Sequence, residues 1–377
     1  MTDKKLTTSK VKKHNQHLIY KLIYEEKEIA RQEIATKLNL SLPTVNQSLK
    51  VLMERGIIEY AGNFQSTGGR KAQVIIPINN AKIAVGVDIR KKEVRILLVD
   101  LYGTILDYKK SSLLFTMGEE YGKQLNGLIE ELVSANKIEK ESLLGVGISF
   151  PGVLNKDSSQ LQYAPSLDLN DYPLKMLTEQ IDYPCVIEND ANAGAFTEIW
   201  NRAKKEPSIY ITVEKGVGGC IILGNEILKG ADNRAGEFGH MTLYPGGRTC
   251  SCGEKGCLEA YISTARLSED LNIELEDFFA GIEQGNQEYQ AIWEDYLHHL
   301  CLGINNIYTA FNTKVILAGH LTPYLVPYLS DIRIKLKELY SFAGEEDVTY
   351  LQLTNYYTKA IAVGAALQWI HKYIESI

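Results

Sequence analysis

The sequence lacks any run of 18 consecutive apolar residues, and only 6 of its 377 residues are cysteine. Without a long apolar run we expect no membrane-spanning helix. The opening stretch MTDKKLTTSKVKKHNQHL is basic but has no apolar core of the kind a signal peptide needs, so we expect a cytoplasmic protein. In that reducing compartment a tight group of cysteines indicates metal binding rather than disulfide bonds.

Three of the six cysteines lie within eight positions, in the segment HMTLYPGGRTCSCGEKGCLEAY. The spacing His-x9-Cys-x-Cys-x4-Cys offers one imidazole and three thiolates, which suits tetrahedral Zn²⁺. Four protein ligands close the coordination shell, so we expect a structural ion rather than a catalytic one. The alternative is that the cysteines pack in a core, but the glycines around them are typical of a loop. The predicted ligands are His240, Cys250, Cys252 and Cys257.

Positive charge is concentrated at the N-terminal end. Residues 1–80 carry 13 Lys and Arg against 7 Asp and Glu, whereas the whole chain has a formal net charge of −7. A basic end on an acidic body indicates a contact with nucleic acid at that end.

The hydrophobic pattern of this basic end predicts three helices. They cover Val11 to Tyr24, Ile29 to Leu38, and a third that Ser41 caps and that runs to Arg55, before Gly56. Pro43 is tolerated in the first turn of the third helix. Its predicted buried stripe is Leu42, Val45, Leu49 and Leu52. Its predicted DNA-contacting side chains are Thr44, Asn46, Gln47 and Lys50.

The following stretch, GIIEYAGNFQSTGGRKAQVIIPI, predicts two strands around a basic, glycine-rich tip. Helix, helix, turn, helix and such a hairpin make a winged helix-turn-helix, with Arg70 and Lys71 placed to reach a groove or phosphates. The alternative is a small helical bundle with a solvated basic face. Lys4 to Lys13 form a basic arm to which we assign no specific contact.

The rest of the chain predicts two similar α/β series. IAVGVDI, EVRILLVD and TILDYKKSSL are strand-like, and they precede an amphipathic helix near 118–135 and the buried strand LLGVGISF. IYITVEK, GGCIILG and EILKG begin a second series from Ser208, which continues through a helical stretch to TKVILAGH. A helix from about Tyr357 to Ile377 closes the chain. Two related lobes with a ligand cleft between them are expected.

Polar residues in four loops could line that cleft. The loops are GISFPGV, IENDANAGA, AGEFGHM and the end of the cysteine loop at Glu259. Carboxylates, an amide and an imidazole suit a polyol such as a sugar, because each can hydrogen-bond hydroxyls. For Asp190 the alternative is a helix cap, since it lies where a strand passes into a helix.

These motifs resemble the ROK family of repressors and sugar kinases. The segments that carry the resemblance are GISFPGV, IENDANAGA, KGVGGCIILG, GADNRAGEFGHM, CSCGEKGCLEAY and, more weakly, VILAGH and AIAVGAA. The resemblance implies an actin-like, ribonuclease-H-like body of two lobes, with zinc on the four ligands named above. It also implies that a sugar is held by Asn189, Asp190, Glu237, His240 and Glu259. Within the family, the layout is most similar to xylose repressors and related sugar-responsive repressors.

Two nucleotide-binding elements of the family's kinases are altered here. The first hairpin, typically Asp-x-Gly-Gly-Thr, reads Asp-Ile-Arg-Lys-Lys from Asp88 to Lys92, so the backbone loses its close approach to phosphate. The loop Gly-Thr-Gly-x-Gly-Gly begins with Glu214, a carboxylate that repels a triphosphate. The third loop keeps Gly319. We therefore expect no enzyme activity, with Asp190 as a vestigial catalytic base, although the basic turn could still bind some phosphate.

The sequence thus predicts a sugar-responsive repressor that binds operator DNA as a homodimer or dimer of dimers. One alternative is an ATP-dependent sugar kinase with a DNA-binding head, and another is a repressor controlled by a protein partner. We divide the chain into a DNA-binding domain with its basic arm (1–80), a first lobe (81–190, with the C-terminal helix 357–377) and a second lobe with the zinc loop (191–356).

Overall fold

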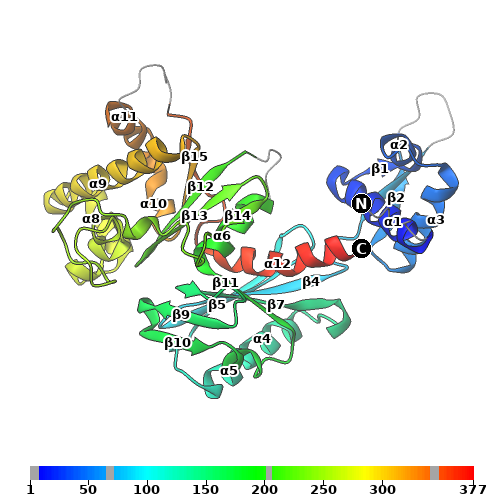
Figure 1. The fold of residues 1–377 in the computed structure, drawn as a ribbon, viewed down its shortest axis with the longest axis horizontal. Coiled ribbons are helices and arrows are strands. Elements are labelled where there is room, and N and C mark those ends of the chain that lie inside the picture. The colour runs from blue at the N-terminus through cyan, green and yellow to red at the C-terminus, as the bar shows by residue number, and fades with distance from the viewer. Residues whose placement is uncertain (1–7, 65–71, 201–205, 340–347) are drawn as a thin grey trace.

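The computed structural model describes residues 8–64, 72–200, 206–339 and 348–377. A small N-terminal head lies beside a larger body, whose described residues form two five-stranded β-sheets and a small three-stranded sheet. The C-terminal helix extends from between the two five-stranded sheets to the head (Figure 1). None of the helices in these ranges is long and apolar enough to cross a membrane.

In the part of the head that the structure describes, three helices accompany a small antiparallel sheet in the order β1-β3-β2. The elements are α1 (Thr8–Glu26), β1 (Ile29–Ala30), α2 (Arg31–Lys37), α3 (Leu42–Glu54), β2 (Ile58–Asn63) and β3 (Gln73–Pro77). Ser41 caps α3 by accepting a hydrogen bond from the Thr44 backbone N–H at 3.4 Å, and Gly56 takes a positive φ of 66° just beyond the helix. The predicted third helix and the wing strands are therefore confirmed.

Two details of the head differ from the prediction. The second helix begins at Arg31 rather than Ile29, because Ile29 and Ala30 pair with Ile75 and Val74 of β3. Their partners lie more than 40 residues away, so local periodicity gave no sign of this strand. Leu42 is 39 % exposed and does not belong to the buried stripe of α3, whereas Val45, Leu49 and Leu52 are buried as predicted.

The first lobe is built on a five-stranded sheet in the order β11-β7-β4-β5-β6. β4, β5 and β6 form an antiparallel meander, and β7 and β11 extend it in parallel. The sheet comprises β4 (Ile83–Ile89), β5 (Glu93–Val99), β6 (Ile105–Ser112), β7 (Leu143–Phe150) and β11 (Cys185–Asn189). Around it lie α4 (Glu119–Ala135), β8 (Val153–Leu154), β9 (Gln160–Ala164), β10 (Leu169–Pro173) and α5 (Lys175–Thr178).

The second lobe repeats this topology in the order β14-β13-β12-β15-β16, again with a meander followed by two parallel strands. Its strands are β12 (Ser208–Val213), β13 (Val217–Leu223), β14 (Glu226–Leu228), β15 (Lys314–Ala318) and β16 (Leu351–Leu353). Its helices are α7 (Glu259–Ile262), α8 (Leu275–Glu283), α9 (Gln287–Phe311), α10 (Thr322–Leu325) and α11 (Leu329–Leu339). The internal repeat predicted from the sequence is present in both sheets.

Two helices, α6 (Asp190–Trp200) and α12 (Ala360–Ser376), pack against each other between the two sheets. α12 lies on the first sheet, and α6 lies on the second. Glycines allow this close approach, because a Cβ at Gly147 of β7 would collide with the Ala365 carbonyl, and a Cβ at Gly364 of α12 would collide with the Ala193 carbonyl. The small residues of AIAVGAA therefore seat α12 tightly against both β7 and α6.

Candidate functional site

His240, Cys250, Cys252 and Cys257 come together in the second lobe, with all four candidate ligand atoms within 4.8 Å of one another. The Sγ atoms of Cys252 and Cys257 are 3.8 Å apart, and His240 Nδ1 is 3.7 Å from Cys250 Sγ. Ligands about 2.3 Å from a tetrahedral zinc ion lie about 3.8 Å from one another, so this set has the spacing of a Zn²⁺ site. The histidine and the three cysteines predicted from the spacing all belong to this cluster.

Tight turns bring the cysteines together. The Cys250 N–H donates to the Glu254 carbonyl at 2.8 Å, and isolated bridges join Thr249 to Lys255 and Thr242 to Cys257. Gly256 has a φ of 87°, and a Cβ there would collide with the Tyr244 carbonyl. The glycines of CSCGEKGC thus serve the turn geometry that the cluster requires.

Asn189 and Asp190 lie at the junction of β11 and α6. Asn189 Oδ1 accepts from the Asn192 backbone N–H at 3.0 Å and so caps α6, while its Nδ2 donates to the Gly152 carbonyl at 2.9 Å. The cap is therefore Asn189, and Asp190 is the first helical residue. Burial raises the pKa of Asp190 to about 7. The nearby carboxylates of Asp88 and Glu237 also raise this pKa, whereas the positive charge of Arg90 lowers it.

Glu237 precedes the short helical turn Phe238–His240, and His240 is the last residue of that turn. His240 directs Nδ1 toward Cys250 and Nε2 toward Glu237, whose Oε2 is 3.9 Å away. Burial raises the pKa of Glu237, with Glu259 adding to the shift. One imidazole nitrogen therefore faces the cysteines while the other faces the Glu237 carboxylate.

Glu259 is 7 % exposed and joins three loops. Its Oε2 accepts from the Val217 backbone N–H at 2.8 Å, and its Oε1 accepts from the Ser251 hydroxyl and lies 3.5 Å from Cys250 Sγ. Oε2 accepts only the Val217 bond among these, so it keeps a lone pair that a ligand hydroxyl could use. Ser251, which sequence reasoning passed over between two cysteines, links this carboxylate to the cysteine loop.

The three loops that correspond to nucleotide-binding elements are joined through Glu214. Arg90, just after β4, donates Nη1 and Nη2 to the two oxygens of Glu214 at 2.7 and 3.2 Å, and Nε to Asp88 at 2.9 Å. The His320 N–H donates to Glu214 Oε1 at 3.0 Å. Burial would raise the pKa of Glu214, but Arg90 holds it below its usual value. The sequence left the basic turn at Arg90 able to bind some phosphate, but the Arg90 side chain is engaged in a bidentate ion pair between the lobes.

The lobes are also joined on the other side of Asp190. Asn233, which has a positive φ of 56°, donates to the carbonyls of Leu154 and Asn155 at 3.1 and 3.0 Å. Lys229 pairs with Glu188 at 2.9 Å. Asn233 lies in the quoted segment GADNRAGEFGHM, but nothing in the spacing indicated its partners.

In the head, Asn46, Gln47 and Lys50 are exposed along α3, and Thr44 is half-buried. The Thr44 hydroxyl lies 2.9 Å from Ser41 Oγ, and Asn46 Oδ1 accepts from Arg31 at 3.2 Å. The predicted contacts Arg70 and Lys71 lie outside the described residues.

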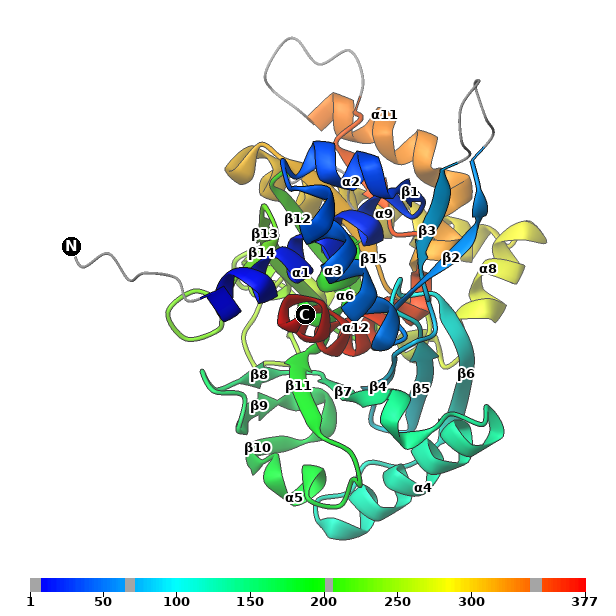
Figure 2. The ribbon, with the colours of Figure 1, turned by 90° about the vertical axis from the view of Figure 1, so that its right-hand side faces the viewer.

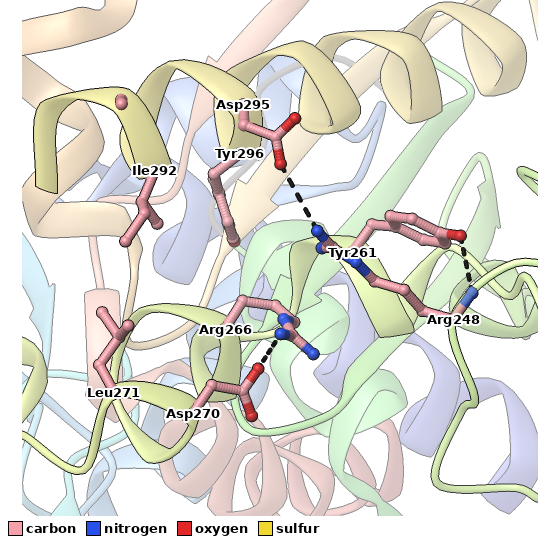
Figure 3. Close-up of a pocket in the computed structure, with 9 residues that line it drawn as sticks. Arg248, Tyr261, Arg266, Asp270, Leu271, Ile292, Asp295 and Tyr296 are labelled. Atoms are coloured by element: carbon pink, nitrogen blue, oxygen red, sulfur yellow. Dashed lines mark hydrogen bonds and ion pairs between the residues drawn. The ribbon is translucent and has the colours of Figure 1, made fainter. Parts of the chain in front are cut away.

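A separate cavity of about 420 Å³ lies in the second lobe beside α7 and α9 (Figure 3). Its arginines are paired internally: Arg248 lies 3.7 Å from Asp295 and over the ring of Tyr261, and Arg266 pairs with Asp270. None of the residues predicted to hold a sugar lines this cavity.

Comparison with known proteins decides the family. The ROK family profile matches residues 84–372, and a winged helix-turn-helix DNA-binding profile matches residues 13–59. The chain belongs to the ROK family. The winged helix-turn-helix and the two-lobe, actin-like ROK body expected from the sequence are confirmed.

Relatives of this ROK chain are named as regulators. It is 29 % identical to the xylose repressor of Bacillus subtilis (strain 168), over 81 % of this chain and 82 % of that protein. It is 28 % identical to the DNA-binding transcriptional dual regulator NagC of Escherichia coli (strain K12), over 69 % of this chain and 64 % of that protein.

Solved structures support the same fold. A ROK family transcriptional regulator homologous to the E. coli MLC protein superposes with a TM-score of 0.74 at 20 % identity, over 97 % of both chains. A ROK family glucokinase from Streptomyces griseus, in complex with glucose and AMPPNP, superposes with a TM-score of 0.62 at 26 % identity, over 76 % of this chain and 98 % of that one. The glucokinase has no counterpart for about a quarter of this chain.

Proposed function

We propose that this ROK protein is a transcriptional repressor that binds operator DNA through its winged helix and a sugar through its body. The head is assigned to residues 1–80, the first lobe to 81–190 with 357–377, and the second lobe to 191–356. Asn189, Asp190, Glu237, His240 and Glu259 are the proposed sugar ligands. Xylose, glucose and related sugars suit them, because carboxylates, an amide and an imidazole can hydrogen-bond hydroxyls, and Glu237 lies near Asp190, His240 and Glu259.

The observation that carries this proposal over a kinase is the Arg90–Glu214 ion pair. A kinase must leave its phosphate-binding loops open to the nucleotide, with backbone N–H groups and glycines facing the phosphates. Here Arg90 is held by the carboxylates of Asp88 and Glu214, and the Asp190 carboxyl also lies close enough to feel its charge. A triphosphate would have to displace a bidentate pair and then face these acids.

We also propose that the cysteine cluster holds a structural Zn²⁺ ion. His240, Cys250, Cys252 and Cys257 would complete its shell, leaving no position for a reacting water. The metal would fix the His240 ring and the loop that carries Glu259, so that His240 Nε2 and the Glu259 carboxylate keep constant positions toward a ligand. Because its partner is DNA, we assign the protein to the cytoplasm.

Binding as a dimer is proposed because proteins with this type of helix-turn-helix contact two half-sites about 34 Å apart, one DNA turn. The sugar can promote release from DNA only to the extent that it binds the DNA-free form of the protein more tightly than the DNA-bound form.

The proposal is tested with an operator selected from random duplexes by the wild-type protein. Xylose or glucose is expected to weaken operator binding by at least about tenfold. ATP at about 1 mM is expected neither to bind nor to be consumed in the presence of either sugar. Production of ADP and sugar phosphate would establish the kinase alternative, and unchanged operator binding across a panel of monosaccharides and their phosphates would favour control by a protein partner.

Base reading by α3 gives a separate prediction. Gln47→Ala is expected to weaken specific operator binding by about 1–3 kcal/mol while leaving binding to random DNA nearly unchanged, because an amide can read a base edge. Arg70→Ala should weaken binding to operator and to random DNA alike and lower the salt dependence of binding, as expected for a phosphate contact. Gln124→Ala, in the exposed part of α4, is the matched control. Equal losses on operator and random DNA for Gln47→Ala would refute base reading.

A further inference from the structure

α6 connects the candidate sugar site to the DNA-binding head. Its first residue is Asp190, a proposed sugar ligand, and its last is Trp200, 11 residues in all, which corresponds to about 15 Å of helix. The Trp200 ring meets Tyr24 of α1 edge-on, with centroids 6.3 Å apart and planes at 70°. One short helix therefore contacts the site at one end and the head at the other.

Tyr24 is fixed to the body at the same point. Its ring stacks on Tyr102 with centroids 4.3 Å apart and planes at 4°. The Tyr24 hydroxyl donates to the Leu101 carbonyl at 2.7 Å, and the Tyr102 hydroxyl donates to the Tyr24 carbonyl at 2.8 Å. We call Tyr24, Tyr102 and Trp200 the aromatic junction. These reciprocal bonds give the end of α1 a defined position against Trp200.

α12 packs against α6 and also contacts the head. Its His371 ring packs edge-on against Phe196 and Trp200 of α6, at 5.7 and 6.3 Å. Near its end, Glu375 lies 3.8 Å from His17 and 3.7 Å from Lys21 of α1. Figures 1 and 2 both place the C-terminus beside the helices of the head.

The apolar core is continuous across this boundary. A single buried cluster includes Ile19 and Ile23 of α1, Leu101 of the first lobe, and Leu367 and Ile370 of α12. Domains within a chain move freely by default unless their interface is large and hydrophobic. Here the described part of the head shares a core with the body, and close-packed cores shift between discrete arrangements rather than deforming gradually.

We propose that α6 transmits sugar binding to the DNA-binding head through the aromatic junction. A sugar that engages Asp190 moves the first turn of α6, Trp200 moves against Tyr24, and α1 changes its angle to the body. Trp200 and Tyr24 are positioning residues, which touch neither sugar nor DNA. This inference rests on the proposed function, and it names the route by which that function is regulated.

The test separates sugar binding from sugar response. Trp200→Phe and Tyr24→Phe are made in the full-length protein, with Trp293→Phe as the matched control, because Trp293 is buried against Tyr296 in the second lobe. Xylose or glucose, whichever releases the wild-type protein from its selected operator, is the probe. Calorimetry gives the sugar Kd, and operator titrations with and without sugar give the response.

We expect the sugar Kd of both junction variants to stay within about threefold of wild type, while the sugar-induced change in operator Kd shrinks at least about fivefold. Trp293→Phe should keep the wild-type sugar Kd and the wild-type change in operator Kd. Tyr24→Phe removes only one hydroxyl, so it decides the result if Trp200→Phe fails to fold.

A fluorescence measurement reads the junction directly. The chain has three tryptophans, so Trp293→Phe with Trp369→Phe leaves Trp200 as the only one. Its emission should change on adding sugar, and Tyr24→Phe should alter that change. Junction variants with the full wild-type response and a silent Trp200 would overturn the inference while leaving the repressor function intact. Wild-type protein that binds no sugar would overturn the proposed function itself.

Discussion

Cys252→Ser is expected to remove the metal and lower the melting temperature by roughly 10 °C. An ion bound only by the folded chain contributes several kcal/mol, and each kcal/mol corresponds to about 2–4 °C in a domain of this size. Cys252 Sγ lies 3.8 Å from Cys257 Sγ, so a hydroxyl there removes one of three soft ligands. The sugar response should be lost too, because the same loop positions Ser251 against Glu259.

Metal content by mass spectrometry and thermal melts check this expectation. Cys185→Ser is the matched control, since Cys185 is half-buried in β11 and its thiol donates to the Tyr183 carbonyl at 3.3 Å, a bond that serine can replace. The control should retain one zinc per chain. Wild-type protein purified without chelator and found to contain no zinc would contradict the metal assignment.

Asp190→Asn is expected to move the inducer curve by about one to two decades without weakening operator binding in the absence of sugar. A hydrogen bond to a charged group contributes roughly 1.5–3 kcal/mol, which corresponds to that shift. Asp190 is a sharper test than Glu259, because Glu259 also accepts from Val217 and Ser251 and its loss would disturb the cysteine loop. Asp171→Asn, at an exposed position with a φ of 51° that asparagine tolerates, is the control.

The same aspartate predicts a pH dependence. Its pKa of about 7 means that Asp190 gains charge as pH rises from 6 to 8, and the charged carboxylate is the stronger acceptor for hydroxyls. Sugar affinity of the wild-type protein should therefore increase over that range. Asp88, Arg90 and Glu237 face Asp190 and remain in the variant, so Asp190→Asn should flatten the profile. An equally steep profile in the variant would assign the titration to another group.

The local features of the head and of the cysteine loop were predictable from sequence because they depend on neighbours in the chain. Ser41, Pro43 and Gly56 define the ends of α3 by short-range hydrogen bonds and backbone preference. The cysteine spacing, with glycines at the turns, implies a cluster before any fold is known. The repeated strand patterns predicted the two similar lobes, because the hydrophobic pattern of each strand is visible in its own segment.

The sequence alone also pointed to the altered nucleotide loops, but it left open that the basic turn containing Arg90 could bind some phosphate. Only the tertiary structure places Arg90 against Glu214, 124 positions away, and Tyr24 against Trp200. It likewise decides that Asn189 rather than Asp190 caps α6, and that Ile29 joins a strand. A side chain's type limits what it can bind, but its partner depends on which surfaces the packed sheets and helices bring together. The packing of the sheets and helices is determined by the free energy of the whole core, so the partner cannot be predicted from any single segment.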